Sequence, residues 1–248
     1  MGRPVVSVAS GGMAVVETLL GTPVTEAANG FGMPVTKVVG RPGMPVVYET
    51  IGVAAPVVYA TFDGVAQDVT LSGGNLIATH TNTNTGAGAR STSLRATRKY
   101  YFEVRINASH GNGDFMGIMS STGTYANVTS GAAGPYAGVY RNTGSVVVGA
   151  AASGKNIGAV VAGSFVGFAV DLDARLLWVR RDATNWNGDV AANPATGANG
   201  VTLTAAISYA PVVTFGAAGT VANDAFTANF GATAYTNSVP SGFGNWGT

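Results

Sequence analysis

The sequence predicts an all-β protein, with an antiparallel sandwich or barrel over residues 61–248 and an extended, β-forming segment over residues 1–60. From residue 61 onward, short apolar runs are separated by Gly, Asn, Thr and Pro, a pattern typical of many short strands joined by turns. Apolar and polar side chains alternate most strictly over residues 100–106. No stretch after residue 60 has a convincing helical period.

The N-terminal segment contains a short repeat. The pattern Gly-x-Pro-Val or a close variant begins at Gly2, Gly12, Gly21, Gly32 and Gly43, and an alternating apolar run follows several copies. Pro removes a backbone donor and suits the first residue of a strand, but a run of this length buries almost nothing alone. We therefore expect residues 1–60 to assemble with neighbouring chains. A disordered linker is the alternative. The residues assigned to assembly are Pro4, Val5, Pro23, Val24, Pro34, Val35, Pro45 and Val46.

The strands expected after residue 60 follow one another at short intervals. Residues 171–175 form a tight hairpin turn between two of them. About 185 residues suffice for one complete core. The predicted strands are Leu76–Thr79, Lys99–Asn107, Phe115–Met119, Ala137–Tyr140, Ser145–Ala150, Phe165–Asp171, Leu176–Arg180, Ala210–Phe215 and Thr227–Phe230, with Phe102, Val104, Ile106 and Trp178 in the core.

The composition argues against several classes of function. Charged residues make up only 10% of the chain, against roughly 25% in an average globular protein, and the net charge is +1. We therefore expect neither nucleic-acid binding nor membrane insertion. Without Cys there is no disulfide framework and no thiolate chemistry. The N-terminus lacks the features of a secretory signal, so we expect a chain made in the cytoplasm.

Neither an enzyme nor a cofactor or metal site is expected. The sequence has no Gly-x-Ser-x-Gly elbow, no phosphate-binding loop and no regular Asp/Asn spacing of a calcium loop. The two histidines, His80 and His110, lie in Asn-, Gly- and Thr-rich segments and are expected in solvent.

The acidic residues offer little catalytic chemistry. Glu103 alternates outward in its strand and is expected on the surface, and Asp171 and Asp173 are expected to organise the hairpin turn. Asp114 and Asp189 remain as loop acids without a partner that the sequence identifies. A glycan-cleaving pair would need two carboxyl groups roughly 5–10 Å apart.

Binding is the favoured type of function. Trp186 lies among donor-rich and acceptor-rich side chains, and an aromatic ring beside amides and carboxylates suits a sugar. The alternative is that Trp186 folds back to close one end of the sandwich. Which end the candidates occupy depends on a register that the sequence leaves open. The candidate ligand-binding residues are Trp186, Asn185, Asn187, Asp189, Tyr125, Tyr140 and Arg141.

Basic side chains concentrate only before the predicted strand at Lys99. Arg90, Arg95, Arg98 and Lys99 are expected as solvated charges or as contacts to another subunit, since the aromatics that accompany nucleic-acid binding are missing. Trp246, close to the C-terminus, is expected to pack on the domain or on a neighbour.

Several runs together resemble the SPRY domain. The strand Lys99-Tyr-Tyr-Phe-Glu-Val-Arg-Ile106 is similar to the opening strand of that family, and residues 163–179 are similar to its most specific hairpin. The resemblance covers about residues 99–243 in the right order. It implies a concanavalin-like, two-sheet antiparallel sandwich that binds partners through loops at one end. The other similar runs are 117–121, 136–144, 212–216, 228–231 and 240–243.

The chain further resembles SPRY-like domains of phage and prophage proteins. Trp186-Asn-Gly188 and Asn193-Pro-Ala-Thr-Gly197 match a loop of that variant, and the N-terminal repeat is similar to the openings of phage structural proteins. The resemblance implies a virion structural protein, a head fibre, decoration protein or tail-associated fibre. Residues 1–60 would contact capsid or tail proteins and oligomerise, with a trimer as the default, while residues 61–248 would present a binding module, its possible ligand a host-surface glycan.

Two other functions stay open. The sandwich could be a cellular SPRY-type protein-interaction module, with residues 1–60 as a linker. It could also be a surface-glycan depolymerase, in which case Asp114 and Asp189 are the only acids to propose.

Overall fold

The computed structural model describes residues 58–247 apart from 63, 64, 83, 85, 92, 110–112, 205, 206 and 217–222. In the N-terminal part it describes the backbone of four strands. The chain divides into two units, Met1–Val57 and Val58–Thr248. The predicted division falls between residues 60 and 61.

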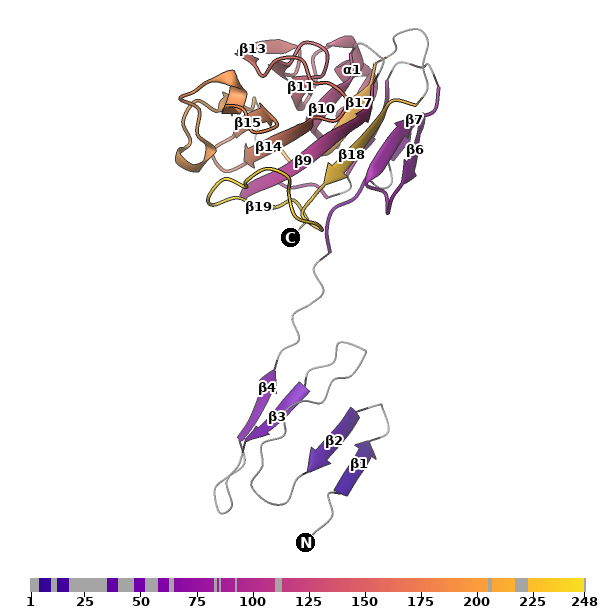
Figure 1. The fold of residues 1–248 in the computed structure, drawn as a ribbon, viewed down its shortest axis with the longest axis vertical. Helices are drawn as coiled ribbons and strands as arrows, with labels where there is room; N and C mark the ends of the chain where they lie inside the picture. The colour runs from indigo at the N-terminus through magenta and orange to yellow at the C-terminus, as the bar shows by residue number, and fades with distance from the viewer. Residues whose placement is uncertain are drawn as a thin grey trace. The chain divides into compact units, whose positions relative to one another are not determined.

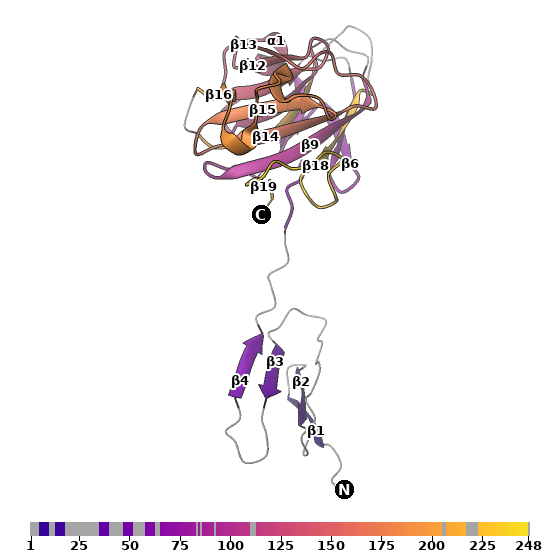
Figure 2. The ribbon, with the colours of Figure 1, turned by 60° about the vertical axis from the view of Figure 1, so that its left-hand side comes forward.

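The second unit is a sandwich of two antiparallel sheets, as predicted (Figures 1 and 2). The first sheet has the strand order β13-β12-β11-β10-β17-β8-β5. Its strands are β5 (Val65–Gln67), β8 (Ala87–Arg90), β10 (Phe115–Ser120), β11 (Tyr136–Tyr140), β12 (Ser145–Val148), β13 (Ala151–Asn156) and β17 (Tyr209–Phe215).

The second sheet has the order β16-β15-β14-β9-β18-β7-β6. A short C-terminal strand, β19 (Gly244–Asn245), pairs in parallel with the beginning of β9. The other strands are β6 (Val69–Ser72), β7 (Ile77–His80), β9 (Lys99–Ala108), β14 (Phe165–Asp171), β15 (Leu176–Arg181), β16 (Val201–Thr202) and β18 (Ala225–Asn229).

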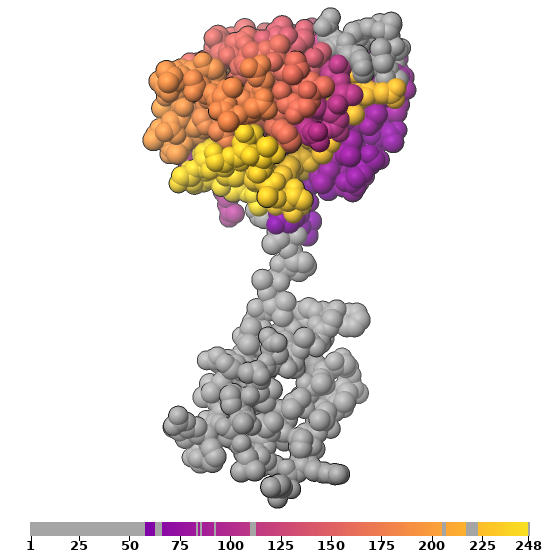
Figure 3. All heavy atoms as spheres, viewed as in Figure 1, coloured from indigo at the N-terminus to yellow at the C-terminus, as the bar shows by residue number. Residues whose placement is uncertain are grey.

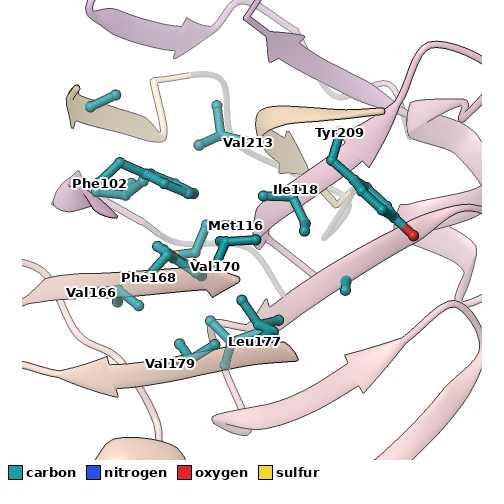
Figure 4. Close-up of a cluster of buried hydrophobic side chains, with 14 of the residues drawn as sticks. Phe102, Met116, Ile118, Val166, Phe168, Val170, Leu177, Val179, Tyr209 and Val213 are labelled. Atoms are coloured by element: carbon teal, nitrogen blue, oxygen red, sulfur yellow. The ribbon is translucent and has the colours of Figure 1, made fainter. Parts of the chain in front are cut away.

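The core lies between the two sheets and follows from the alternation in β9. Phe102 pairs with Phe168 of β14, and their rings stack with centroids 4.7 Å apart. Met116 and Val213 enter the same cluster from the first sheet (Figure 4). The predicted hairpin is also present: the Asp171 carboxylate accepts a hydrogen bond from the Ala174 amide at 2.8 Å, so it organises the turn as expected.

The outer face of the first sheet is covered by a short helix that the sequence did not predict, α1 (Tyr125–Ser130). The Thr124 side chain caps its N-terminus by accepting from the Asn127 amide, and Gly131 ends it with φ of 68°. A helix of six residues is too short to show a period in the sequence. Tyr125 and Val128 pack against a cluster that includes Phe115.

The outer face of the second sheet is covered by loops. Trp178 of β15 is completely buried there rather than in the central core. It packs with Ala192 and with Phe243 of the C-terminal segment. Figure 3 shows the C-terminal segment, in yellow, on the surface of the sandwich. Between β15 and β16 lie two 3₁₀ turns, η1 (Trp186–Gly188) and η2 (Pro194–Thr196).

In the N-terminal unit, neighbouring copies of the repeat pair as hairpins. β1 (Val5–Ala9) pairs with β2 (Met13–Glu17), and β3 (Val35–Val39) pairs with β4 (Val47–Ile51), both antiparallel. Of the residues assigned to assembly, Val5 and Val35 each begin a strand. The rest lie outside the described residues: Pro4, Pro23, Val24, Pro34, Pro45 and Val46.

The structure corrects several predictions about polar residues. Arg90 is not a solvated charge: residues 87–90 form β8, and Arg90 is buried, with Nη1 donating to the Ser120 carbonyl at 2.5 Å. His80 is no solvated loop residue either, because it ends β7 and is buried. His110 lies outside the described residues. Arg95 and Lys99 are half-buried, and only Arg98 of the basic group is exposed.

The sandwich has two ends, separated by the length of β9. At the β19 end, Phe62 donates its amide to Asn75, and Gly247 lies against the backbone of Ala60. Trp246 is completely buried there and contacts the Tyr100 ring at 5.0 Å between centroids, so it packs on the domain. The chain therefore enters the sandwich at this end. The opposite end, where β9 leads into Asp114, is called the Asp114 end below.

Candidate functional site

The loop after β15 is held by Asn187, one of the candidate ligand-binding residues. Asn187 has φ of 53° and is buried. Its Oδ1 accepts from the Val179 amide at 2.8 Å, and its Nδ2 donates to the Asn199 carbonyl at 3.0 Å. The side-chain amide of Asn187 thus forms hydrogen bonds with the main chain of β15, as a neighbouring strand would. Its polar atoms are used by the protein and not available to a ligand.

Trp186 is half-buried against the second sheet. The Arg180 guanidinium lies over its ring at 4.3 Å from the centroid, and the Tyr101 ring meets it edge-on at 6.4 Å. The placement agrees with the alternative that Trp186 folds back onto the sandwich. Asn185 beside it is exposed, and its side chain makes no cap to η1.

Asp189 ties this loop to the edge strand β13. Its Oδ2 accepts from Lys155 Nζ at 2.8 Å and from Asn199 Nδ2 at 3.2 Å. The hydrogen bond from Lys155 lowers the pKa of Asp189 below its ordinary value, and the bond from the Ala191 amide adds to this. Asp189 is therefore ionised at neutral pH and stabilises the loop through an ion pair that the sequence did not identify.

Tyr125, the first residue of α1, and Tyr140 of β11 lie at the outer face of the first sheet. Burial raises the pKa of Tyr125 to about 12. The Tyr140 hydroxyl donates to the Val128 carbonyl at 2.6 Å, so it anchors α1. The two tyrosines therefore do not form one rim with Trp186, which lies on the outer face of the second sheet.

Arg141, the last candidate, lies at the Asp114 end in the turn between β11 and β12. Its Nε donates to Asp114 Oδ2 at 3.3 Å, and its Nη1 donates to the Val160 carbonyl at 3.4 Å. Asp114, expected as a loop acid without a partner, is instead completely buried and paired.

Asp114 joins three connections at this end. Its Oδ2 also accepts from Ser109 Oγ at 2.7 Å, and its Oδ1 accepts from the Gly216 amide at 3.1 Å. Burial raises the pKa of Asp114 to about 6 against the bonds from Ser109, Arg141 and Gly216, and the negative charge of Asp224 adds to the increase. Sequence spacing could not bring these residues together, because Arg141 and Gly216 follow strands far along the chain from Asp114 and meet it only through the pairing of β10 with β11 and with β17.

Two further buried polar groups were assigned to the surface by their sequence patterns. Glu103 is buried on the outer face of the second sheet, where it accepts from Tyr101 Oη at 2.7 Å and from the Thr236 and Asn237 amides at 2.8 Å. The His80 ring stacks on Phe215 at 5.3 Å, and neither ring nitrogen has a hydrogen-bond partner among the described residues.

The acids are not arranged as a glycosidase pair. Asp114 and Asp189 belong to separate hydrogen-bond networks, and Asp114 has no surface that a saccharide could reach. The residues that the structure describes contain no group of three His, Cys, Asp or Glu side chains placed to hold a metal ion. The described helices include none with the length and apolar character needed to cross a membrane.

Comparison with a solved structure agrees with the sandwich. The SPRY domain of human HERC1 superposes with a TM-score of 0.52 at 12% identity, over 66% of this chain and 92% of that chain. The TRIM65 PSpry domain gives a TM-score of 0.47 at 13% identity, over 69% of this chain and 92% of that chain. No family model matches the sequence, and no curated protein matches it either. The fold is thus SPRY-like, and at such low identity the likeness concerns the fold alone.

Proposed function

We propose that the chain is a display protein, in which residues 1–57 assemble and attach the molecule and the SPRY-like sandwich binds a partner through the Asp114 end. The observation that carries this proposal is the position at which the chain enters the sandwich. Residues 58–62 lie at the β19 end, and β9, with its ten residues, separates that end from Asp114. At roughly 3.3 Å per residue, about 30 Å lies between them. A ligand at the Asp114 end would therefore bind at the end of the sandwich opposite to residues 58–62.

The pairing of the repeat supports assembly as the role of the N-terminal unit. Each described hairpin there has only two strands of five residues. An isolated two-stranded hairpin is at best marginally stable in water, and further strands or packing are needed. We propose that copies of the same chain supply them, in a trimer as the default.

A neutral glycan is the ligand class that we propose for the Asp114 end. Exposed residues that the structure describes in the connections at this end include Asn84, Asn142 and Thr143, whose side chains are uncharged amides and a hydroxyl. Such groups exchange hydrogen bonds with sugar hydroxyls without the cost of removing a charge from water. Because the repeat and the loop motif resemble those of phage proteins, we propose a role in a phage-like virion, as a head fibre, decoration protein or tail-associated fibre whose residues 1–57 contact capsid or tail proteins.

Native mass tests the assembly. The full chain is compared with a shorter chain that begins at Val58, where the second unit starts. We expect an oligomer for the full chain and a monomer for the shorter one. Two monomers would remove assembly from the proposal and would favour a cellular protein-interaction module with a linker.

Binding of the chain to cell surfaces tests the proposal that the Asp114 end of the sandwich binds a ligand. The full chain is incubated with cells that carry neutral surface polysaccharide, and the variant Asn142→Ala/Thr143→Ala is expected to bind several-fold more weakly. Arg98→Ala is the matched control, since Arg98 is exposed in the segment between β8 and β9 at the β19 end. Equal loss in both variants would show that the Asp114 end is not the binding surface. Release of sugar fragments during the incubation would instead indicate a depolymerase.

A further inference from the structure

Beyond the proposed function, the Asp114 end contains a buried ionisable side chain with several hydrogen-bond partners. One carboxylate, Asp114, receives donors from three separate connections: Ser109 after β9, Arg141 after β11 and Gly216 after β17. We propose that Asp114 is a proton-operated latch for the Arg141 side chain: ionised, it holds the guanidinium, and protonated, it releases that ionic bond while the other two contacts remain.

The three contacts differ in what protonation does to them. A protonated carboxyl still has a carbonyl oxygen, so it can keep accepting from the Gly216 amide. The Ser109 hydroxyl both donates and accepts, so it can turn and accept the new proton at the same position. Arg141 has donors only, and its bond to Asp114 depends on the negative charge. Protonation therefore weakens the Arg141 contact selectively.

The backbone of the turn does not depend on the carboxylate. The Arg141 amide donates to the Asp114 carbonyl at 2.8 Å, and the Val160 amide donates to the Arg141 carbonyl at 2.8 Å. Both bonds join main-chain groups, which do not titrate. The latch therefore moves a side chain and leaves the turn in place.

The environment of Asp114 predicts that Arg141 is released at mildly acidic pH. Burial raises the pKa of Asp114 to about 6. Two charged groups act on it with opposite effects: Asp224, the buried residue immediately before β18, disfavours its ionisation, while Arg141 favours it. His110, between Ser109 and Asp114 in the sequence, lies outside the described residues, and an unperturbed histidine side chain has a pKa of about 6.5. The test must separate the two residues.

Nuclear magnetic resonance on the full chain can follow both partners. The side-chain carboxyl carbon of Asp114 and the Nε–H of Arg141 are recorded between about pH 4.5 and about pH 7.5, a range that brackets the pKa of Asp114. We expect both signals to change with one midpoint near 6, the pKa of Asp114 in the folded chain. The Arg141 Nε–H should exchange on the order of tenfold faster on the acid side after correction for the intrinsic pH effect. The Gly216 amide is expected to stay protected.

Three variants separate the possible causes. Asp114→Asn should remove the transition and leave Arg141 in its acid-side state at every pH. His110→Gln should keep the midpoint, as should Asp189→Asn, which breaks the unrelated pair with Lys155. Loss of the transition in His110→Gln would overturn the proposal. So would an Arg141 signal that stays protected while Asp114 titrates, a result that wild-type protein gives even if Asp114→Asn does not fold.

Discussion

Asn187 shows how one side chain can fix a loop that looks, from its composition, like a binding loop. Its amide satisfies main-chain groups of β15 and of residue 199, and it is buried while doing so. We predict that Asn187→Ala lowers the free energy of unfolding by about 1–3 kcal/mol, because buried main-chain donors and acceptors lose their partner. Asn185→Ala, two residues earlier and exposed, should change it by less than about 0.5 kcal/mol. Urea unfolding of both variants makes the comparison, and equal effects would contradict it.

His80 is a second residue whose structural position supports a prediction. Its ring is stacked on Phe215 and buried, without a partner among the described residues for either nitrogen. His80→Phe replaces the imidazole by an apolar ring that keeps the stacking. We predict a gain of about 1 kcal/mol in stability, because two unsatisfied polar atoms leave the interior. Thermal unfolding measures it, and a clear loss of stability would show that the imidazole is hydrogen-bonded.

At the scale of elements, the sequence predicted the strands rich in large apolar residues and missed strands with few of them, as well as the short edge strands β5, β6 and β16. β9, β14 and β15 lie almost where their patterns place them, because each has one or both faces buried. β8 and β13 consist of small or polar residues, Ala-Gly-Ala-Arg and Ala-Ala-Ser-Gly-Lys-Asn, and are strands only because a neighbouring strand pairs with them. The fold class was therefore predictable, but the sheet edges were not.

The same reason limits the prediction of the site. Alternation places Glu103 opposite the core, which is correct, but a sequence pattern cannot show that the segment around Thr236 covers it. Arg141 and Asp114 lie 27 positions apart and meet only through the pairing of β10 with β11. Local patterns therefore identified polar side chains of interest and could not assign their partners.

The strand β19 supports a prediction about how the sandwich is closed. Trp246 follows it, is completely buried and packs on Tyr100 and Phe102. Trp246→Ala should lower the free energy of unfolding by about 3–5 kcal/mol, because it leaves a large cavity in the core. Trp186→Ala is the matched control, since Trp186 is half-buried, and its loss should be clearly smaller. A larger loss for Trp186→Ala in chemical denaturation would contradict this view of the C-terminal segment.

At the scale of the whole molecule, Asp114 makes stability depend on pH with a sign opposite to that of a salt-bridged carboxylate. Its pKa is about 6 in the folded chain, against an ordinary value of 3.8. Between these values the folded state binds more protons than the unfolded state, so this residue lowers the free energy of unfolding as pH rises from about 4 to about 6. Above about pH 6 its contribution stays constant.

We therefore predict that wild-type protein loses stability relative to Asp114→Asn between about pH 4 and about pH 7, by up to about 3 kcal/mol. The difference between the two chains isolates Asp114 from the other titrating groups. Urea unfolding at several pH values gives both curves. Parallel curves over this range would mean that Asp114 titrates at the same pH in the folded and unfolded states.

The position of the N-terminal attachment has a mechanical consequence. A pull between residues 58–62 and a ligand at the Asp114 end acts along the strands, because β9 runs from one end to the other. The hydrogen bonds of β9 to β14 and β18 are then loaded in shear, so the force is shared among them. If the force acted perpendicular to the strands, these bonds would break one after another. A sandwich pulled in this direction resists forced extension better than the same sandwich pulled across its sheets.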